Sequence, residues 1–333
     1  MRPIAIAIHG GAGTIDKDSM TPELEGALRQ ALEQAALVGY QSLLTGGSAL
    51  DAVVATVSAL EDCEHFNAGK GSVLNDKEMV EMDASVMFSP SRQAGAVTGV
   101  RHIKNPVQLA RCVLEQSPHV LLSGDGAETF AFERGFTYQE QDYFFTERRY
   151  QQLLQARKNG DAQLSENGHP PSWLSGFPDD KKYGTVGAVA LDAQGHLAAA
   201  TSTGGLTNKQ YGRIGDSPLI GSGTWAEAGN VAVSTTGVGE FFICYNVASD
   251  VAARTRYLKE PLSMACERII QGELKQAGGE GGLVALNAQG EIHFALNSTG
   301  MYRAQVASDG QVKSAIFADQ LLSPWHSEAR SHT

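Results

Sequence analysis

A long polar segment divides this chain and restricts the possible folds more than any other feature. Residues 158–184, KNGDAQLSENGHPPSWLSGFPDDKKYG, contain three prolines and follow neither the helical nor the strand period. A structureless stretch of this length is uncommon inside a compact domain unless it is functional or processed. Thr185 and the buried-strand pattern of residues 186–191 follow at once. We therefore expect a flexible linker at about 158–184 that ends at a bond of special importance, Gly184–Thr185.

The patterns on both sides of this segment predict strands and helices that occur in runs. Before it, hydrophobic spacing and capping residues predict a strand at 3–8, helices at 21–46, 48–60 and 105–117, and two or three strands between 72 and 100. After it, they predict hairpin turns in the similar heptapeptides 189–195 and 284–290, with helices at 240–258 and 262–276. Runs of each kind favour helices layered over antiparallel sheet, so the expected class is α+β in one structural domain.

Charge and composition argue against several functional classes. The formal net charge is −11 and no dense Lys/Arg cluster occurs, which argues against binding to nucleic acid or to an anionic membrane. No apolar run reaches transmembrane length, and the N-terminal run is too short for a signal peptide, so we expect a cytoplasmic protein. The cysteines lack metal-site spacing and are expected to be buried small side chains: Cys63, Cys112, Cys244 and Cys266.

Nucleotide binding is not expected. Residues 67–72 lack the first glycine of a phosphate loop and the Ser or Thr that should follow its lysine. His9, between a strand and a glycine loop, is expected to be a hydrogen-bonded core or turn residue rather than a base.

Thr185 admits two interpretations. A threonine hydroxyl is a poor nucleophile without a base, but its own α-amine can serve as that base once the chain before it is cut. The reference pKa of an α-amino group, about 7.7–8.0, leaves a substantial fraction unprotonated near neutral pH. Taken alone, the junction at Gly184–Thr185 favours the other interpretation, in which Thr185 is an ordinary strand threonine after a linker.

Three neighbouring motifs favour the catalytic interpretation. Residues 201–205, TSTGG, end the strand expected to pair with that of Thr185, so hydroxyl groups can line one strand edge. Arg213 and Asp216 stand on a glycine-flanked loop and can bind a carboxylate and an ammonium together, as an amino-acid substrate requires. Residues 235–240, TTGVGE, place a hydroxyl and backbone N–H groups before a helix, as in an oxyanion site.

These motifs closely resemble those of the plant-type L-asparaginase / isoaspartyl aminopeptidase family of N-terminal-nucleophile hydrolases. The order and spacing agree over nearly the whole chain: HGGAG at 9–13, FNAG at 66–69, GTVGAVA at 184–190, AATSTGG at 199–205, GRIGDSP at 212–218 and TGVG at 236–239. The resemblance implies an αββα sandwich made as an inactive precursor. It also implies self-cleavage into an N-terminal subunit, 1–184, and a C-terminal subunit, 185–333, which stay in one fold and dimerise.

The resemblance implies catalytic roles at the matching positions. Thr185 corresponds to the nucleophile, and Thr203 and Thr236 are the accompanying threonines. Thr236 and the Gly237 N–H are the expected oxyanion donors, and Asn67 is expected to orient the new N-terminus. The implied activity is hydrolysis of isoaspartyl (β-aspartyl) dipeptides and L-asparagine through an aspartyl acyl-enzyme, with release of L-aspartate.

The resemblance also implies a substrate site and a cation site. Arg213 would hold the substrate α-carboxylate, and Asp216 with the Gly239 carbonyl would hold its α-ammonium. Catalysis needs no cofactor, but a structural sodium ion is expected on the backbone carbonyls of Leu60, Glu61, Cys63, Phe66, Ala68 and Lys70. The expected partners are a small-molecule or dipeptide substrate and a second cleaved protomer.

Two alternatives stay open. The glycosylasparaginase branch of the family usually carries an acidic residue, not Gly184, before the nucleophile. A small-molecule-binding relative that keeps the fold without cleavage would stay one intact chain. The sequence does not decide between isoaspartyl peptides and asparagine, because both present the same aspartyl head group.

Overall fold

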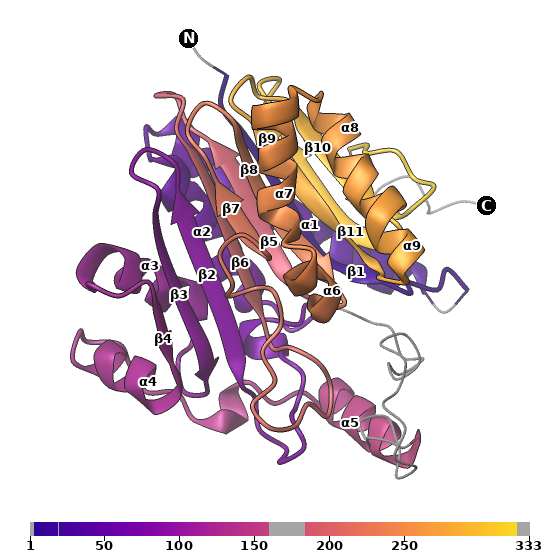
Figure 1. Cartoon of the computed structure of the whole chain (residues 1–333). Coiled ribbons are helices and arrows are strands. Elements are labelled where there is room, and N and C mark those ends of the chain that lie inside the picture. The colour runs from indigo at the N-terminus through magenta and orange to yellow at the C-terminus, as the bar shows by residue number, and fades with distance from the viewer. Residues whose placement is uncertain (1–2, 19, 160–183, 325–333) are drawn as a thin grey trace.

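The structure is a computed structural model that describes residues 3–18, 20–159 and 184–324. Two stacked β-sheets lie between two layers of helices (Figure 1), which confirms the predicted α+β class and its αββα sandwich. The linker expected at 158–184 lies outside the described residues apart from its ends.

Among the described residues, the larger sheet has eight strands and the smaller sheet has four. The larger sheet runs in the order β12 (Val312–Phe317), β11 (Gly300–Val306), β1 (Ala5–Gly13), β5 (Val186–Leu191), β6 (Leu197–Thr203), β2 (Met82–Phe88), β3 (Gln93–Val100) and β4 (Leu121–Ser123). The smaller sheet runs in the order β10 (Ile292–Leu296), β9 (Gly281–Asn287), β8 (Val231–Gly237) and β7 (Thr224–Ala226).

Helices cover the outer faces of both sheets (Figure 1). The larger sheet is covered by α1 (Pro22–Leu44), α2 (Ala49–Glu61), α3 (Pro106–Gln116) and α4 (Gly124–Phe132), and α5 (Glu147–Asn159) follows them in the chain. The smaller sheet is covered by α6 (Gly239–Cys244), α7 (Val247–Ala253), α8 (Leu262–Glu267) and α9 (Lys275–Ala277), with π-helical turns at 254–258 and 268–274. None of the helices in the described part of the chain combines the length and the apolar content that a membrane crossing requires.

Local sequence signals set the helix starts as predicted. Thr21 caps α1 and is followed by Pro22 in the first turn. Ser48 and Asp51 form a complete capping box at the start of α2, in which each side chain bonds the other's backbone N–H.

The continuous helix predicted over 240–258 is wrong. Asn246 has a left-handed backbone (φ +50°) and separates α6 from α7. The helix predicted over 262–276 is confirmed as the continuous run from α8 to α9.

The expectation of four buried cysteines holds for two of them: Cys112 and Cys266 are buried, Cys63 is half-buried and Cys244 is exposed.

Side chains on the strands of the larger sheet alternate between two cores. On β1, Ile6 and Ile8 pack under the helices, whereas Ala5 and Ala7 face the smaller sheet. Alanine is the commonest residue among the buried apolar side chains of the layer between the sheets, and so short a side chain lets the sheets pack closely. Toward one end of the strands this inter-sheet layer becomes polar, with His9, Ser85, Thr201 and Ser234 fully buried there.

Strands from the two sides of the Gly184–Thr185 bond are interleaved in the larger sheet. β5 lies between β1 and β6, and β6 pairs in turn with β2. The backbone hydrogen bonds of three strand pairs, β1–β11, β1–β5 and β2–β6, therefore join the two predicted subunits.

Candidate active site

Thr185 lies at the head of β5, at the polar end of the layer between the sheets. Only 6% of the residue is exposed. Its Oγ1 atom lies 3.2 Å from Thr203 Oγ1 and 3.4 Å from Ser217 Oγ. Its carbonyl oxygen lies 3.0 Å from His9 Nδ1, so the expectation that His9 is a hydrogen-bonded core residue is confirmed. The predicted nucleophile is thus surrounded by hydroxyl groups.

The β5–β6 hairpin brings Thr185 and Thr203 together. The two strands pair in antiparallel register, so both threonines stand at the same end of the hairpin. The connecting turn begins at Asp192, whose Oδ1 atom accepts hydrogen bonds from two backbone N–H groups. Gly195 supplies the positive φ (+86°) that the turn requires. The strand pairing predicted from the sequence is confirmed.

A small cavity of ≈ 10 Å³ joins Thr185 to residues predicted to bind substrate. Its lining includes Gly184, Thr185, Thr203, Arg213, Asp216 and Gly237. This volume is about what one water molecule needs. The predicted nucleophile, one accompanying threonine, both charged residues and one predicted oxyanion donor therefore line the same cavity.

Arg213 is held by Glu240, which lies in the first turn of α6. Its Nε and Nη2 atoms donate to the two carboxylate oxygens of Glu240, each at 2.9 Å. Burial raises the pKa of Glu240, but the bonds to Arg213 outweigh it, and the pKa lies below its ordinary value. The Nη1 atom makes no hydrogen bond to any residue that the structure describes. This atom is therefore available to a ligand carboxylate.

Asp216 is buried beside Arg213. Burial raises the pKa of Asp216 to about 6, against the opposing effects of a hydrogen bond from Thr235 and the charge of Arg213. The Thr235 hydroxyl donates to Asp216 Oδ2 at 2.6 Å. A Cβ at Gly239 would lie 2.9 Å from Arg213 Nη2 and 3.0 Å from Asp216 Oδ1. Glycine at this position therefore lets α6 approach the charged pair.

Thr236 and Gly237 end strand β8. The Thr236 oxygen accepts a hydrogen bond from the Ala12 N–H at 3.2 Å, which leaves its own hydrogen for another acceptor. Gly237 has a φ of +155°, and a Cβ there would lie 2.4 Å from the Glu280 carbonyl oxygen. Gly237 lines the small cavity, whereas Thr236 is fully buried and does not line it.

Asn67 holds the loop after β6 against Gly184. Its Nδ2 atom donates to the Gly205 carbonyl at 2.8 Å, and its Oδ1 atom accepts from the Val73 N–H at 2.9 Å. A Cβ on Gly184 would lie 2.7 Å from the Asn67 Cβ, so a larger residue would not fit without a shift. Asn67 therefore borders the bond before Thr185 on its N-terminal side.

The predicted cation loop is a tight turn after α2. The carbonyl oxygens of Glu61 and Phe66 approach the loop's own glycines: a Cβ on Gly69 or Gly71 would lie 2.3 Å or 2.1 Å from them. Gly69 also has a positive φ (+52°). Backbone carbonyl oxygens are the kind of donor that suits a hard cation, and those of Leu60, Cys63 and Ala68 also accept backbone hydrogen bonds within the loop. Within the described ranges, no group of three or more His, Cys, Asp or Glu side chains could hold a metal ion.

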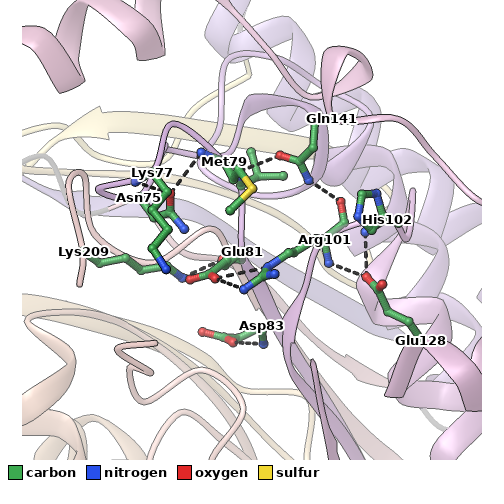
Figure 2. A network of polar contacts seen from close by, with 12 residues as sticks. Asn75, Lys77, Met79, Glu81, Asp83, Arg101, His102, Glu128, Gln141 and Lys209 are labelled. Atoms are coloured by element: carbon green, nitrogen blue, oxygen red, sulfur yellow. Dashed lines mark hydrogen bonds and ion pairs between the residues drawn. The ribbon is translucent and has the colours of Figure 1, made fainter. Parts of the chain in front are cut away.

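A group of charged residues, of which Lys209 and Asp83 are buried, lies at the start of strand β2 (Figure 2). Lys209 donates to the Glu81 carbonyl at 2.6 Å, and Arg101 donates to the Glu81 carboxylate at 2.6 Å. Asp83 pairs with Thr203 across the sheet. Burial raises the pKa of Asp83 and lowers that of Lys209, and each charge opposes the shift of the other. The sequence motifs did not predict this group, although a charged residue in an otherwise apolar strand was a usable signal.

A larger cavity of ≈ 710 Å³ lies on the other side of Gly184. Its lining includes His65, Asn67, Arg148, Arg149, Gly184 and Tyr302. Gly184 therefore borders both cavities, and Thr185 lines only the small one.

Comparison with known proteins agrees with this geometry. An αββα sandwich of this kind is the fold of the N-terminal-nucleophile hydrolases. The family model described as Asparaginase matches residues 1–316, and the chain belongs to this family, as its motifs predicted.

Relatives of known name resemble nearly the whole chain. An Escherichia coli (strain K12) protein named isoaspartyl peptidase is 48% identical over 91% of this chain and 93% of its own length. Proteins named isoaspartyl peptidase/L-asparaginase are 42% identical in Bos taurus, over 95% of this chain and 96% of their own length, and 40% identical in Homo sapiens, over 96% and 97%.

Proposed function

We propose that this chain is a self-processing threonine amidohydrolase that cleaves isoaspartyl dipeptides and L-asparagine. The observation that carries the proposal is the small cavity that Thr185, Arg213 and Asp216 line together. A cut before Thr185 frees an α-amine next to its hydroxyl, and the two charges match the α-carboxylate and α-ammonium of an aspartyl head group. The names of the relatives support the same substrates.

In the proposed reaction, the α-amine of Thr185 takes the proton of Oγ1 as this oxygen attacks the substrate β-carbonyl. Thr236 and the Gly237 N–H stabilise the negative charge on the carbonyl oxygen. The C–N bond then breaks, the amine leaves with the proton, and an aspartyl ester remains on Thr185. Water, deprotonated by the same α-amine, then attacks the ester carbonyl. The α-ammonium returns the proton to Oγ1 as the C–O bond breaks, and L-aspartate is released. Thr203, 3.2 Å from Oγ1, orients the nucleophile.

The same hydroxyl is proposed to cut its own chain by attack on the Gly184 carbonyl. Because strands of both products pair with each other in one sheet, the products would stay together after the cut. A dimer of such cleaved protomers is the proposed assembly, and a cytoplasmic location stays a prediction.

A denaturing gel of the purified protein should show two fragments, and the smaller should begin at Thr185. One intact chain would favour the uncleaved binding protein instead. Hydrolysis of glycosylated asparagine without hydrolysis of isoaspartyl dipeptides would favour the glycosylasparaginase branch.

Arg213→Ala and Asp216→Ala should each lower kcat/KM for an isoaspartyl dipeptide while self-cleavage still occurs. Loss of one charge-assisted contact costs roughly 1.5–3 kcal/mol, which corresponds to about one to two decades. Arg268→Ala is the control. It removes an exposed arginine directly after α8 and should leave kcat/KM unchanged. Unchanged hydrolysis in either test variant would remove that residue from the substrate site.

We also propose that the loop after α2 binds a sodium ion through the carbonyls of Leu60, Glu61, Cys63, Phe66, Ala68 and Lys70. A bound cation would offset the repulsion among these oxygens and stabilise the loop that leads into Asn67. The thermal midpoint should therefore be higher in sodium chloride than in choline chloride of equal ionic strength. Gly69→Ala, with its Cβ 2.3 Å from the Glu61 carbonyl, should abolish this difference. Equal midpoints in the two salts for the unmutated protein would contradict the proposal.

A further inference from the structure

The imidazole of His9 bridges the two sheets beside Thr185, yet the proposed reaction gives it no role. His9 is fully buried on β1, opposite Gly187 of β5. Its Nδ1 atom lies 3.0 Å from the Thr185 carbonyl oxygen. Its Nε2 atom lies 2.9 Å from the hydroxyl of Ser234, which stands on β8 of the smaller sheet.

These two contacts determine the tautomer of His9. A carbonyl oxygen only accepts hydrogen bonds, so Nδ1 must carry the hydrogen that Thr185 receives. Burial lowers the pKa of His9 to about 3, so the ring is neutral and its other nitrogen is an acceptor. Ser234 must therefore donate its hydroxyl hydrogen to Nε2.

The tautomer in turn sets the direction of the next hydrogen bonds. The Ser234 oxygen lies 2.7 Å from Thr201 Oγ1 and, with its own hydrogen used, must accept from it. Thr201 accepts from Thr224 Oγ1 at 2.5 Å. The chain of donors thus runs from Thr224 through Thr201, Ser234 and His9 to the carbonyl of Thr185.

Ser85 and Ser217 lie between the start of this chain and the nucleophile. Ser85 Oγ lies 2.8 Å from Thr224 Oγ1 and 2.6 Å from the Ser217 carbonyl oxygen, and its single hydrogen serves one of these two acceptors. The Ser217 hydroxyl lies 3.4 Å from Thr185 Oγ1. The chain of donors therefore ends on the Thr185 carbonyl, and Ser217, whose carbonyl lies near its start, places its own hydroxyl beside the Thr185 hydroxyl.

Gly187 provides the space that this bridge needs. A Cβ at Gly187 would lie 2.5 Å from His9 Nε2 and 2.0 Å from Ser234 Oγ. Any side chain at this position would occupy the place of the His9–Ser234 hydrogen bond. The second glycine of Gly184-Thr-Val-Gly187 is thereby explained by the bridge.

We infer that His9 is a positioning residue that holds the carbonyl of Thr185 through its Nδ1–H and so aims the threonine hydroxyl at the small cavity. The inference rests on the proposed role of Thr185 as nucleophile. Without this hydrogen bond, the Thr185 peptide unit can rotate and Oγ1 spends less time in the attacking position. The charged groups that bind substrate stand on another loop, so His9 should affect kcat and self-cleavage but not KM.

The sharpest test compares two amide substitutions at this position. An asparagine places its N–H near the position of Nδ1, whereas a glutamine places its polar group near Nε2. His9→Asn should keep kcat within about threefold of the unmutated enzyme, because the bond to Thr185 is retained. His9→Gln should lower kcat and the rate of self-cleavage by about tenfold or more, with KM changed less than about twofold. Equal kcat in the two variants, or a loss confined to KM, would overturn the inference.

A spectroscopic measurement on the unmutated protein keeps the inference testable if a variant does not fold. Long-range ¹H–¹⁵N spectra should show His9 neutral and protonated at Nδ1 from about pH 5 to 8. Protonation at Nε2 alone, or titration in this window, would overturn it. The proposed function is tested separately. If the Thr185→Ala variant still hydrolysed substrate, the proposed role of Thr185 would fail, whatever result the two His9 variants gave.

Discussion

Thr185→Ala should give one uncut chain with no measurable hydrolysis of isoaspartyl dipeptides or L-asparagine. The substitution removes the oxygen that attacks both the Gly184 carbonyl and the substrate, so processing and turnover are lost together. The substitution removes only a hydroxyl and a methyl group beside a small cavity, and the fold should persist. A denaturing gel, mass spectrometry and near-UV circular dichroism measure the three outcomes.

Two further variants make this result specific. Thr185→Ser keeps a hydroxyl at the same place and should still process itself and turn over substrate. Thr129→Ala removes an exposed threonine of α4 and should behave as the unmutated protein. Turnover by Thr185→Ala, or a fragment of the unmutated protein that begins at another residue, would contradict the mechanism.

The processed enzyme should show two ionisations on the acidic side of its pH profile. The α-amine of Thr185, with a reference pKa of about 7.7–8.0, must be unprotonated to act as the base. Asp216 must be charged to hold the substrate ammonium, and its pKa is raised to about 6 by burial. Both groups lose the active form as the pH falls, so log kcat/KM should fall with slope one below the first pKa and approach slope two below about pH 6.

The profile of kcat alone separates the two groups. It reports the enzyme–substrate complex, in which the bound ammonium keeps Asp216 ionised. The lower ionisation should therefore disappear from kcat and the amine should remain. The same second ionisation in both profiles would contradict the role of Asp216.

Chemical blocking identifies the base. Selective modification of the Thr185 α-amine should abolish activity completely while near-UV circular dichroism is unchanged. His9 cannot substitute for the amine, because burial lowers its pKa to about 3 and its Nδ1–H is donated to the Thr185 carbonyl. Full activity after confirmed blocking would exclude the amine as the base.

Local features of the fold followed from the sequence because they depend on a few adjacent residues. The capping box at Ser48 and Asp51, the turn that begins at Asp192, and the strand after Thr185 are examples. The helix predicted over 240–258 failed for a related reason: hydrophobic spacing continues through Asn246, but its backbone is left-handed there. Spacing along a chain does not report a single residue's φ.

The residue types of the site are also readable from the sequence. A threonine after Gly184, and an arginine and an aspartate on one glycine-flanked loop, indicate amino-acid chemistry by their types and spacing alone. In the folded chain, Thr185, Arg213 and Asp216 surround one cavity. Motifs of this kind are predictive because reactive groups and the glycines that fit around them lie within a few residues of each other.

Contacts between residues far apart in the chain were decided only by the tertiary structure. Glu240 holds Arg213 through two hydrogen bonds, and His9 and Ser234 meet although 225 positions separate them. The same packing buries Asp216 and raises its pKa to about 6. The sequence alone determined which chemical groups this protein carries and the local turns that present them. Their partners, tautomers and pKa values depend on which strands pair and which side chains lose water, and those are properties of the assembled sandwich.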